Sequence, residues 1–228
     1  AAVTQTGKNV EFIPKASIAY DITDDNMVYA LYTKGFRPGG TNRSKGDLSR
    51  LVFPTIYNGD VVTNYEIGSK NRFFDNMMQL NITYFYMKWQ DFQLQMVDPS
   101  SQPCVSGGEE VFCDQPWQSV VANSAAGAHT EGVELDVILA PVDGLRIGGN
   151  INWLSAKTDG AFESLDFTIP GGQVLPNTPK WKGSIWSSYH WPTEVVSGGE
   201  LFVRGQYTYK GKSDNTMIIK EAAPILVN

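Results

Sequence analysis

Histidine and cysteine, the residue types most often used as catalytic bases, nucleophiles and zinc ligands, are scarce in this chain of 228 amino acids. The histidines are His129 and His190, and the cysteines are Cys104 and Cys113. A nucleophilic triad needs a base beside a Ser or Cys, and no Gly-x-Ser-x-Gly elbow occurs. Neither histidine has the spacing to a second ligand that zinc sites show. The residue types therefore predict no catalytic site, no metal site and no cofactor.

The two cysteines flank a polar stretch that contains Glu109 and Glu110. In an oxidising compartment, Cys104 and Cys113 at this spacing form a disulfide that closes a loop; two free thiols are the alternative. With Asp114, the two glutamates could bind a cation, but a solvated acidic loop is the simpler interpretation. We expect the disulfide and no metal.

A glycine-containing stretch earlier in the chain also carries basic residues. Its relevant positions are Arg37, Gly39, Gly40, Arg43, Lys45, Gly46 and Arg50. A phosphate-binding loop would need Gly-x-Gly-x-x-Gly or Gly-Lys-Ser between a strand and a helix, and neither pattern is present. We expect a loop whose arginines help to attract an anionic ligand.

Composition narrows the class of protein. The net charge of −6 and the pI near 4.9 argue against a nucleic-acid partner, which requires a clustered basic surface. Charged residues make up only 18% and aromatic residues 12%, and 22 glycines favour strands and turns. No apolar run approaches the roughly 18 residues of a membrane-spanning helix, and the first residues do not resemble a signal peptide.

The elements that must position these side chains are predicted to be strands. From Met78 to Tyr86 every second residue is apolar, and the residues between them are polar through Thr83. The apolar phase continues from Phe92 to Met96. The pattern therefore predicts one long strand with two distinct faces.

Similar alternation predicts about eight strands in total, which include the segments 10–21, 27–36, 62–72, 133–139, 145–153, 181–191 and 201–209. Aromatic residues stand near the ends of several of them: Tyr20, Tyr86, Trp89, Trp153, Trp181, Trp191 and Tyr209. Long strands with an aromatic at each interface are typical of bilayer-crossing β-barrels. A soluble β-sandwich would have equally apolar core faces, so periodicity leaves both possibilities open.

The lengths of the connections favour the barrel. Tight turns are predicted at 23–26, 75–76 and 141–144, and a somewhat looser turn at 193–199; long polar connections are predicted at 37–61, 98–126 and 158–179. Short and long connections thus alternate along the chain. Antiparallel up-and-down barrels of the outer membrane have short periplasmic turns and long external loops, whereas a sandwich has no reason to alternate.

Several short motifs occur in an order that resembles the barrel of TonB-dependent receptors. They are VYALYTKGFRPGG at 28–40, NYEIGSK at 64–70, FDN at 74–76, FYMKWQD at 85–91, GVEL at 132–135, LPNTPKW at 175–181 and YKGKSD at 209–214. The resemblance covers nearly the whole chain. It implies a 22-stranded barrel of the bacterial outer membrane that is filled by an N-terminal plug.

The resemblance also implies a function. Such receptors bind a scarce ligand, such as a ferric siderophore, at external loops and import it when the TonB complex pulls on the plug. Residues 1–228 then form a partial barrel that lacks the plug and the last strands, with outer-membrane lipid as a further partner. The ligand-contact candidates are Arg37, Arg43, Tyr57, Asn58, Trp117, Gln118 and Phe162, because such side chains stack on and hydrogen-bond to small ligands.

Two other classes stay open on the sequence alone. A soluble β-rich hydrolase or carbohydrate-binding module would use its exposed Trp and Tyr residues as a sugar platform, and His190→Ala would abolish hydrolysis. An adhesin-like sheet would bind no ligand. Membrane partitioning with heat-modifiable migration in gels would favour the barrel. Siderophores, haem, cobalamin and oligosaccharides all use this barrel, so the sequence does not specify the ligand.

Overall fold

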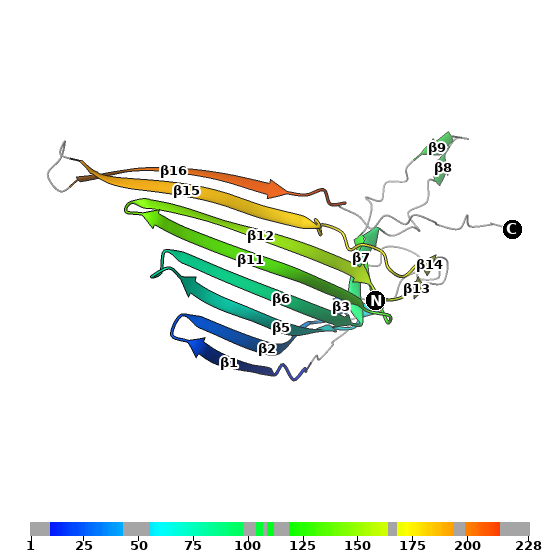
Figure 1. Cartoon of the computed structure of the whole chain (residues 1–228). Helices are drawn as coiled ribbons and strands as arrows, with labels where there is room; N and C mark the ends of the chain where they lie inside the picture. The colour runs from blue at the N-terminus through cyan, green and yellow to red at the C-terminus, as the bar shows by residue number, and fades with distance from the viewer. Residues whose placement is uncertain are drawn as a thin grey trace.

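The computed structural model describes residues 10–42, 55–97, 104–106, 109–111, 119–163, 168–193 and 199–214. Its centre is one antiparallel sheet of eight strands (Figure 1). In spatial order these are β1 (Lys15–Thr23), β2 (Asn26–Arg37), β5 (Asp60–Phe73), β6 (Met78–Gln90), β11 (Ala128–Val142), β12 (Leu145–Thr158), β15 (Trp181–Thr193) and β16 (Gly199–Lys210). Because this order is also the order in the chain, the sheet is an open, up-and-down partial barrel. The predicted fold class and strand number are confirmed.

Four small hairpins occupy the long connections. They are β3 (Gly40–Thr41) with β4 (Ile56–Tyr57), β7 (Phe92–Val97) with β10 (Ser119–Ser124), β8 (Cys104–Ser106) with β9 (Glu109–Val111), and β13 (Phe162–Glu163) with β14 (Thr168–Ile169). All four lie beyond the same end of the sheet, and the short turns lie at the other end (Figure 1). We call these the loop end and the turn end. No helix in the described part of the chain is long and apolar enough to cross a membrane.

The register of the strands gives the sheet two chemically different faces. Side chains of directly paired residues lie on the same face. Ile67 pairs with Tyr84, Tyr84 with Val133, Val133 with Trp153, and Trp153 with Trp181. These residues define the apolar face. The opposite, polar face carries most of the charged and amide side chains of the sheet.

The apolar face is the more exposed of the two. Ile67 is 59% exposed and Tyr207 is 66% exposed, whereas Asn64 and Ser188 on the polar face are 9% and 7% exposed. A soluble sheet shows the opposite arrangement, because a large apolar surface in water is unfavourable. The sheet therefore curves around its polar side and presents its apolar side outward, as a barrel wall in lipid does.

The predicted strand from Met78 to Met96 is wrong in its second half. β6 ends at Gln90, and Asp91 takes the left-handed backbone conformation with a φ of 52°, which Asp tolerates better than most residues. β7 then leaves the main sheet and pairs with β10. The apolar phase survives the break, so the sequence pattern did not reveal it.

Two smaller predictions also need correction. The first strand begins at Lys15 and not near Val10, because Pro14 has no N–H to donate to a neighbouring strand. Trp89 lies on the polar face, one residue out of phase with Lys88, and not on the aromatic rim of the apolar face. There it packs against a small hydrophobic cluster of Ala128, Ala156 and Leu175.

Candidate functional site

The candidate site is the layer of hairpins at the loop end, and its base is an ion pair. Arg37 ends β2, Asp60 begins β5, and the two residues are directly paired. Arg37 Nε donates to both carboxylate oxygens of Asp60, at 2.9 and 3.1 Å, and a terminal guanidinium nitrogen donates to Oδ2. The backbone N–H of Gln93 adds a third donor group, which lies 3.0 Å from Asp60 Oδ2. Asp60 is 0% exposed, so these donors replace the water that it loses.

Arg37 also joins this ion pair to the hydrophobic cluster. Its guanidinium carbon lies 5.1 Å from the centre of the Trp89 ring and 5.6 Å from that of Phe92. Both distances are within the range of cation–π attraction. The Arg37 side chain nevertheless remains 46% exposed. It can therefore hold Asp60 and still face the solvent.

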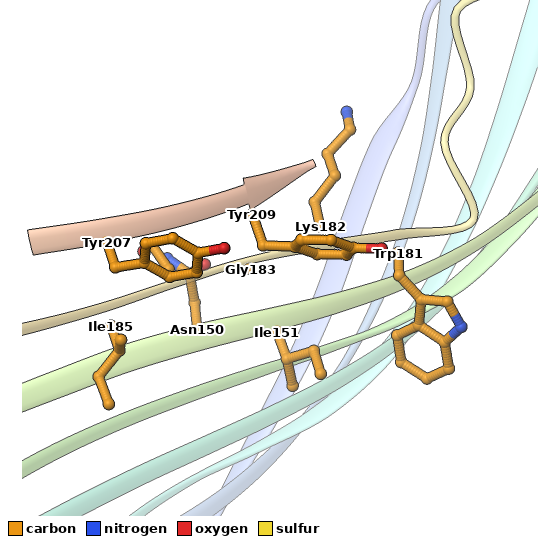
Figure 2. Close-up of a pocket in the computed structure, with 9 residues that line it drawn as sticks. Asn150, Ile151, Trp181, Lys182, Gly183, Ile185, Tyr207 and Tyr209 are labelled. Atoms are coloured by element: carbon orange, nitrogen blue, oxygen red, sulfur yellow. The ribbon is translucent and has the colours of Figure 1, made fainter. Parts of the chain in front are cut away.

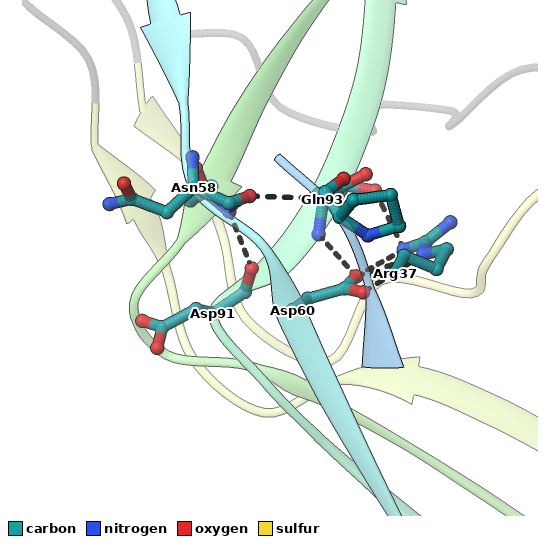
Figure 3. Close-up of polar contacts among 7 residues, drawn as sticks. Arg37, Asn58, Asp60, Asp91 and Gln93 are labelled. Carbon is teal, nitrogen blue, oxygen red and sulfur yellow. Dashed lines mark hydrogen bonds and ion pairs between the residues drawn. The ribbon is translucent and has the colours of Figure 1, made fainter. Parts of the chain in front are cut away.

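Amide side chains connect the neighbouring hairpins. Asn123 of β10 accepts a hydrogen bond from the backbone N–H of Asn58 at 2.7 Å, and its Nδ2 donates to the Asn58 carbonyl at 3.0 Å. The same Nδ2 donates to the Asp91 carbonyl at 2.7 Å. Gln93 Nε2 donates to the carbonyls of Asn58 and Pro38, at 3.0 and 2.9 Å. Figure 3 shows the contact between Asn58 and Gln93 beside the Arg37–Asp60 pair.

A second amide pair repeats this arrangement. Asn42 Nδ2 donates to the Val121 carbonyl at 2.7 Å, and the Val121 N–H donates to Asn42 Oδ1 at 2.8 Å. In both pairs a side-chain amide takes the place of a neighbouring strand's peptide group. The connection from β2 to β5 and the β7–β10 hairpin are thus held together as one layer.

The structure brings three of the predicted ligand-contact residues into this layer. Arg37 forms the ion pair, and Asn58 accepts and donates through its backbone. Tyr57 of β4 packs directly on Gly40, where a Cβ atom would lie 2.4 Å from the Tyr57 hydroxyl. Whether they contact a ligand stays a prediction.

The other predicted site residues are placed differently or not described. Phe162 lies in β13 opposite Ile169 and is 7% exposed, so its ring faces the protein interior. Arg43, Trp117 and Gln118 lie outside the described residues. For the predicted disulfide, Cys104 lies in β8, and Cys113 is outside the described residues.

Three residues of this layer were not among the predicted site residues: Asp60, Gln93 and Asn123. A signal for Asp60 exists in the sequence, because Arg37 and Asp60 stand at the two ends of one connection and carry opposite charges. The amides carry no such signal, since Gln93 and Asn123 look like ordinary polar positions of short strands.

Within the sheet, the polar face carries a further hydrogen-bonded group. The Tyr29 hydroxyl lies 2.6 Å from Glu66 Oε1 and 3.0 Å from the Thr83 hydroxyl oxygen. Asn152 Nδ2 donates to Glu134 Oε1 at 2.7 Å on neighbouring strands. These carboxylates face the concave side, where a barrel has its lumen.

The apolar face carries a shallow hollow between β12, β15 and β16. Gly183 leaves room there for lack of a side chain, and the walls are Ile151, Trp181, Ile185, Tyr207 and Tyr209. Figure 2 shows Ile151, Trp181 and Ile185 on one side of the sheet and Lys182 on the other. A hollow with such walls fits a hydrocarbon chain and not a polar ligand.

Comparison with known proteins agrees with this architecture. The family pattern described as "TonB dependent receptor-like, beta-barrel" matches residues 2–221. The probable TonB-dependent siderophore receptor PiuA of Acinetobacter baumannii is 24% identical over 212 residues, which cover 89% of this chain and 26% of PiuA. The ferric-pyoverdine 358 receptor of Pseudomonas putida is 23% identical over 181 residues, which cover 79% of this chain and 18% of the receptor.

Two solved structures are similar in fold. The ferric yersiniabactin uptake receptor FyuA of Yersinia pestis superposes with a TM-score of 0.60 at 20% identity, covering 89% of this chain and 27% of FyuA. The alcaligin outer membrane receptor FauA of Bordetella pertussis superposes with a TM-score of 0.52 at 20% identity. The match covers 89% of this chain and 30% of FauA. The chain therefore spans between 18% and 30% of the length of these four proteins.

Proposed function

The chain belongs to the TonB-dependent receptor-like β-barrel family, and from this premise we propose that it forms part of the wall of an outer-membrane receptor that imports a ferric siderophore. The observation that carries the proposal is the reversal of the two faces, in which apolar side chains such as Ile67 and Tyr207 are exposed and polar side chains such as Asn64 and Ser188 are buried. This reversal suits a sheet that has lipid on its convex side and a wet lumen on its concave side.

The loop layer is the proposed ligand-binding end. Arg37, Tyr57 and Asn58 lie in it, and Arg43, Trp117 and Gln118 belong to the same long connections, as does Phe162, whose ring is buried. The exposed part of the Arg37 guanidinium would attract an anionic ferric complex, and aromatic and amide groups would stack on it and hydrogen-bond to it. The amide pairs hold the backbone at Asn58 and Val121 in place before the ligand arrives, which reduces the entropic cost of binding.

Import requires parts that lie beyond this segment. In the proposal, residues 1–228 are a partial barrel, and the complete receptor supplies the remaining strands and an N-terminal plug. The TonB complex contacts that plug and uses inner-membrane energy to release the ligand inward. In the proposal the complete receptor is a transporter and not an enzyme.

The decisive experiment uses the complete receptor that carries this segment, in a bacterial strain lacking its own siderophore receptors. Uptake of radioactive iron is measured with ferric pyoverdine, ferric alcaligin and ferric yersiniabactin as probes. We expect uptake of at least one probe, and its loss when an uncoupler removes the inner-membrane energy. A receptor that reaches the outer membrane but gives no energy-dependent uptake with any of the three would contradict the siderophore assignment.

Membrane insertion is tested separately. Cell fractionation and heat-modifiable migration in gels report whether the receptor is a folded barrel in the outer membrane. Recovery of the receptor as a folded monomer in plain buffer would instead support the soluble β-rich alternative. The exposed apolar face already disfavours that alternative, because a soluble module must bury such a face.

A further inference from the structure

The apolar face carries very few charged groups, and they are not scattered. On the eight sheet strands, its lysines are Lys34, Lys88 and Lys157. The other lysines and arginines of these strands alternate onto the polar face: Lys15, Arg37, Lys70, Arg72, Arg146, Lys182, Arg204 and Lys210. The positive charge of the outward surface is therefore confined to three positions.

These three positions form a single row across five neighbouring strands. Lys34 pairs with Thr63, Thr63 with Lys88, Lys88 with His129, and His129 with Lys157. We call this set the lysine row. Neighbouring strands are about 4.8 Å apart, so successive lysines are separated by about 10 Å at the backbone. Two long, flexible lysine side chains can converge on one group that lies between them.

The row has a defined height on the wall. Lys34 and Lys88 each stand two residues beyond a tyrosine, Tyr32 and Tyr86, in the direction of the loop end. Tyr65 pairs with both tyrosines, so an aromatic line runs below the lysines. Two residues correspond to about 7 Å along a strand. In membrane barrels such aromatics mark the interface, which places the ammonium groups at the level of the lipid headgroups.

The lysines of the row lack acidic partners within the described part of the chain. Two carboxylates on this side have other partners: Asp159 pairs with His129 Nδ1, and Glu131 accepts a hydrogen bond from the Tyr84 hydroxyl at 3.2 Å. The described residues show no ion pair for Lys34, Lys88 or Lys157. Within the described residues, the row is therefore a set of three lysines without an ion-pair partner, and it lies above an apolar surface.

We propose that Lys34, Lys88 and Lys157 bind the phosphate groups of an anionic lipid in the leaflet on the loop side. The inference rests on the proposed function, because it requires the apolar face to lie in a membrane. Charge complementarity and height select a lipid: the ammonium groups meet the phosphates, and the exposed apolar face below, including Ile67 and Tyr84, meets the acyl chains. A free phosphate ion has no apolar group that could contact this apolar surface.

The test uses the complete receptor, purified in detergent, and titrated with lipid A, a glycolipid with two phosphates, or with the same lipid after removal of its phosphates. Native mass spectrometry reports the bound fraction. The test variant is Lys34→Gln/Lys88→Gln/Lys157→Gln. The matched control is Lys15→Gln/Lys182→Gln/Lys210→Gln, which removes the same charge from the polar face.

Each lysine near an anionic surface is worth about a fivefold change in affinity, so we expect the test variant to bind lipid A about a hundredfold more weakly. The control should bind as the unmodified receptor does, and the dephosphorylated lipid should bind to all three equally weakly. Added salt should weaken binding only where the row is intact.

Other outcomes would overturn the inference. Equal loss in both variants would mean that only net charge matters, and unchanged binding in the test variant would mean that the row holds no lipid. Competition by free inorganic phosphate at equal concentration would show a phosphate site instead. Heat-modifiable migration in gels distinguishes failure of the lipid proposal from failure of the proposed function. A receptor that does not form a barrel refutes both, whereas a folded test variant that binds lipid A as the unmodified receptor does refutes only the lipid-binding role of the lysine row.

Discussion

At the scale of single residues, the least ordinary feature is a carboxylate that is completely buried at the edge of a loop layer. The Asp60 carboxylate is buried and accepts hydrogen bonds from the Arg37 guanidinium and from the Gln93 N–H. Such a pair contributes less to stability than its distances suggest, because both groups lose water when it forms. Removing one partner of the pair is more costly, because the other partner then remains as an uncompensated charge.

We therefore expect Arg37→Met to destabilise the folded receptor by about 2 to 3 kcal/mol, somewhat less than for a fully buried pair because the arginine is half exposed. The measurement is urea unfolding of the receptor in detergent, followed by gel migration. The double variant Arg37→Met/Asp60→Asn should recover most of the loss. If the double variant is as unstable as the single one, the buried charge is not the cause.

A second residue-scale prediction concerns Gly144 in the turn between β11 and β12. Its φ of 79° is in the left-handed region, and a Cβ atom there would lie 2.1 Å from the His190 carbonyl oxygen. Gly144→Ala should cost about 2 kcal/mol or more in urea unfolding. Gly205→Ala is the matched control, because a Cβ at Gly205 has no atom within 4 Å, and it should be neutral or slightly stabilising. Equal effects of the two changes would contradict this explanation.

At the scale of the elements, the sequence was sufficient for the sheet but not for the loop layer. Alternation, turn residues and motif order predicted the eight strands, because each strand repeats one local rule over many residues. The break at Asp91 was missed because β7 keeps the apolar phase of β6. The amide pairs were missed because they join segments about 65 to 79 residues apart, and nothing local in the sequence selects which amide meets which strand.

These amide pairs predict how the loop layer responds to mutation. Asn123→Ala removes the partner of the Asn58 N–H and carbonyl, so residues 55–59 and 119–124 should exchange backbone hydrogens about tenfold faster. Exchange in the strands of the sheet should not change. Gln206→Ala, on exposed β16, is the control and should leave the loop layer as it is. Uniformly faster exchange throughout the receptor would indicate general destabilisation instead.

At the scale of the whole molecule, the reversed faces determine which solvent each tryptophan meets. Trp153, Trp181 and Trp191 lie on the apolar face, whereas Trp186 lies on the polar face, where the guanidinium of Arg204 stands 5.0 Å from its ring centre. This assignment could be derived from alternation alone for the strands that it covers. Alternation does not show which face points outward. That orientation follows only from the exposure of the side chains in the folded sheet.

In vesicles with brominated acyl chains, we expect the fluorescence of the receptor to be quenched through its outward tryptophans. Trp181→Phe should reduce the quenched fraction, because Trp181 is 44% exposed on the apolar face. Trp186→Phe should lower the total tryptophan emission, while the emission that the bromine atoms quench stays nearly unchanged. The reverse pattern would mean that the faces are assigned the wrong way round.

The neighbour-to-neighbour order of the eight strands has a consequence for how such a wall can evolve. Each strand depends only on the strands beside it, so an inserted or deleted hairpin leaves every other partnership and every face unchanged. A single added residue inside a strand would instead turn the rest of that strand over. Duplication of whole hairpins is therefore the permitted step, and because barrel diameter grows with strand number, it widens the pore by small increments.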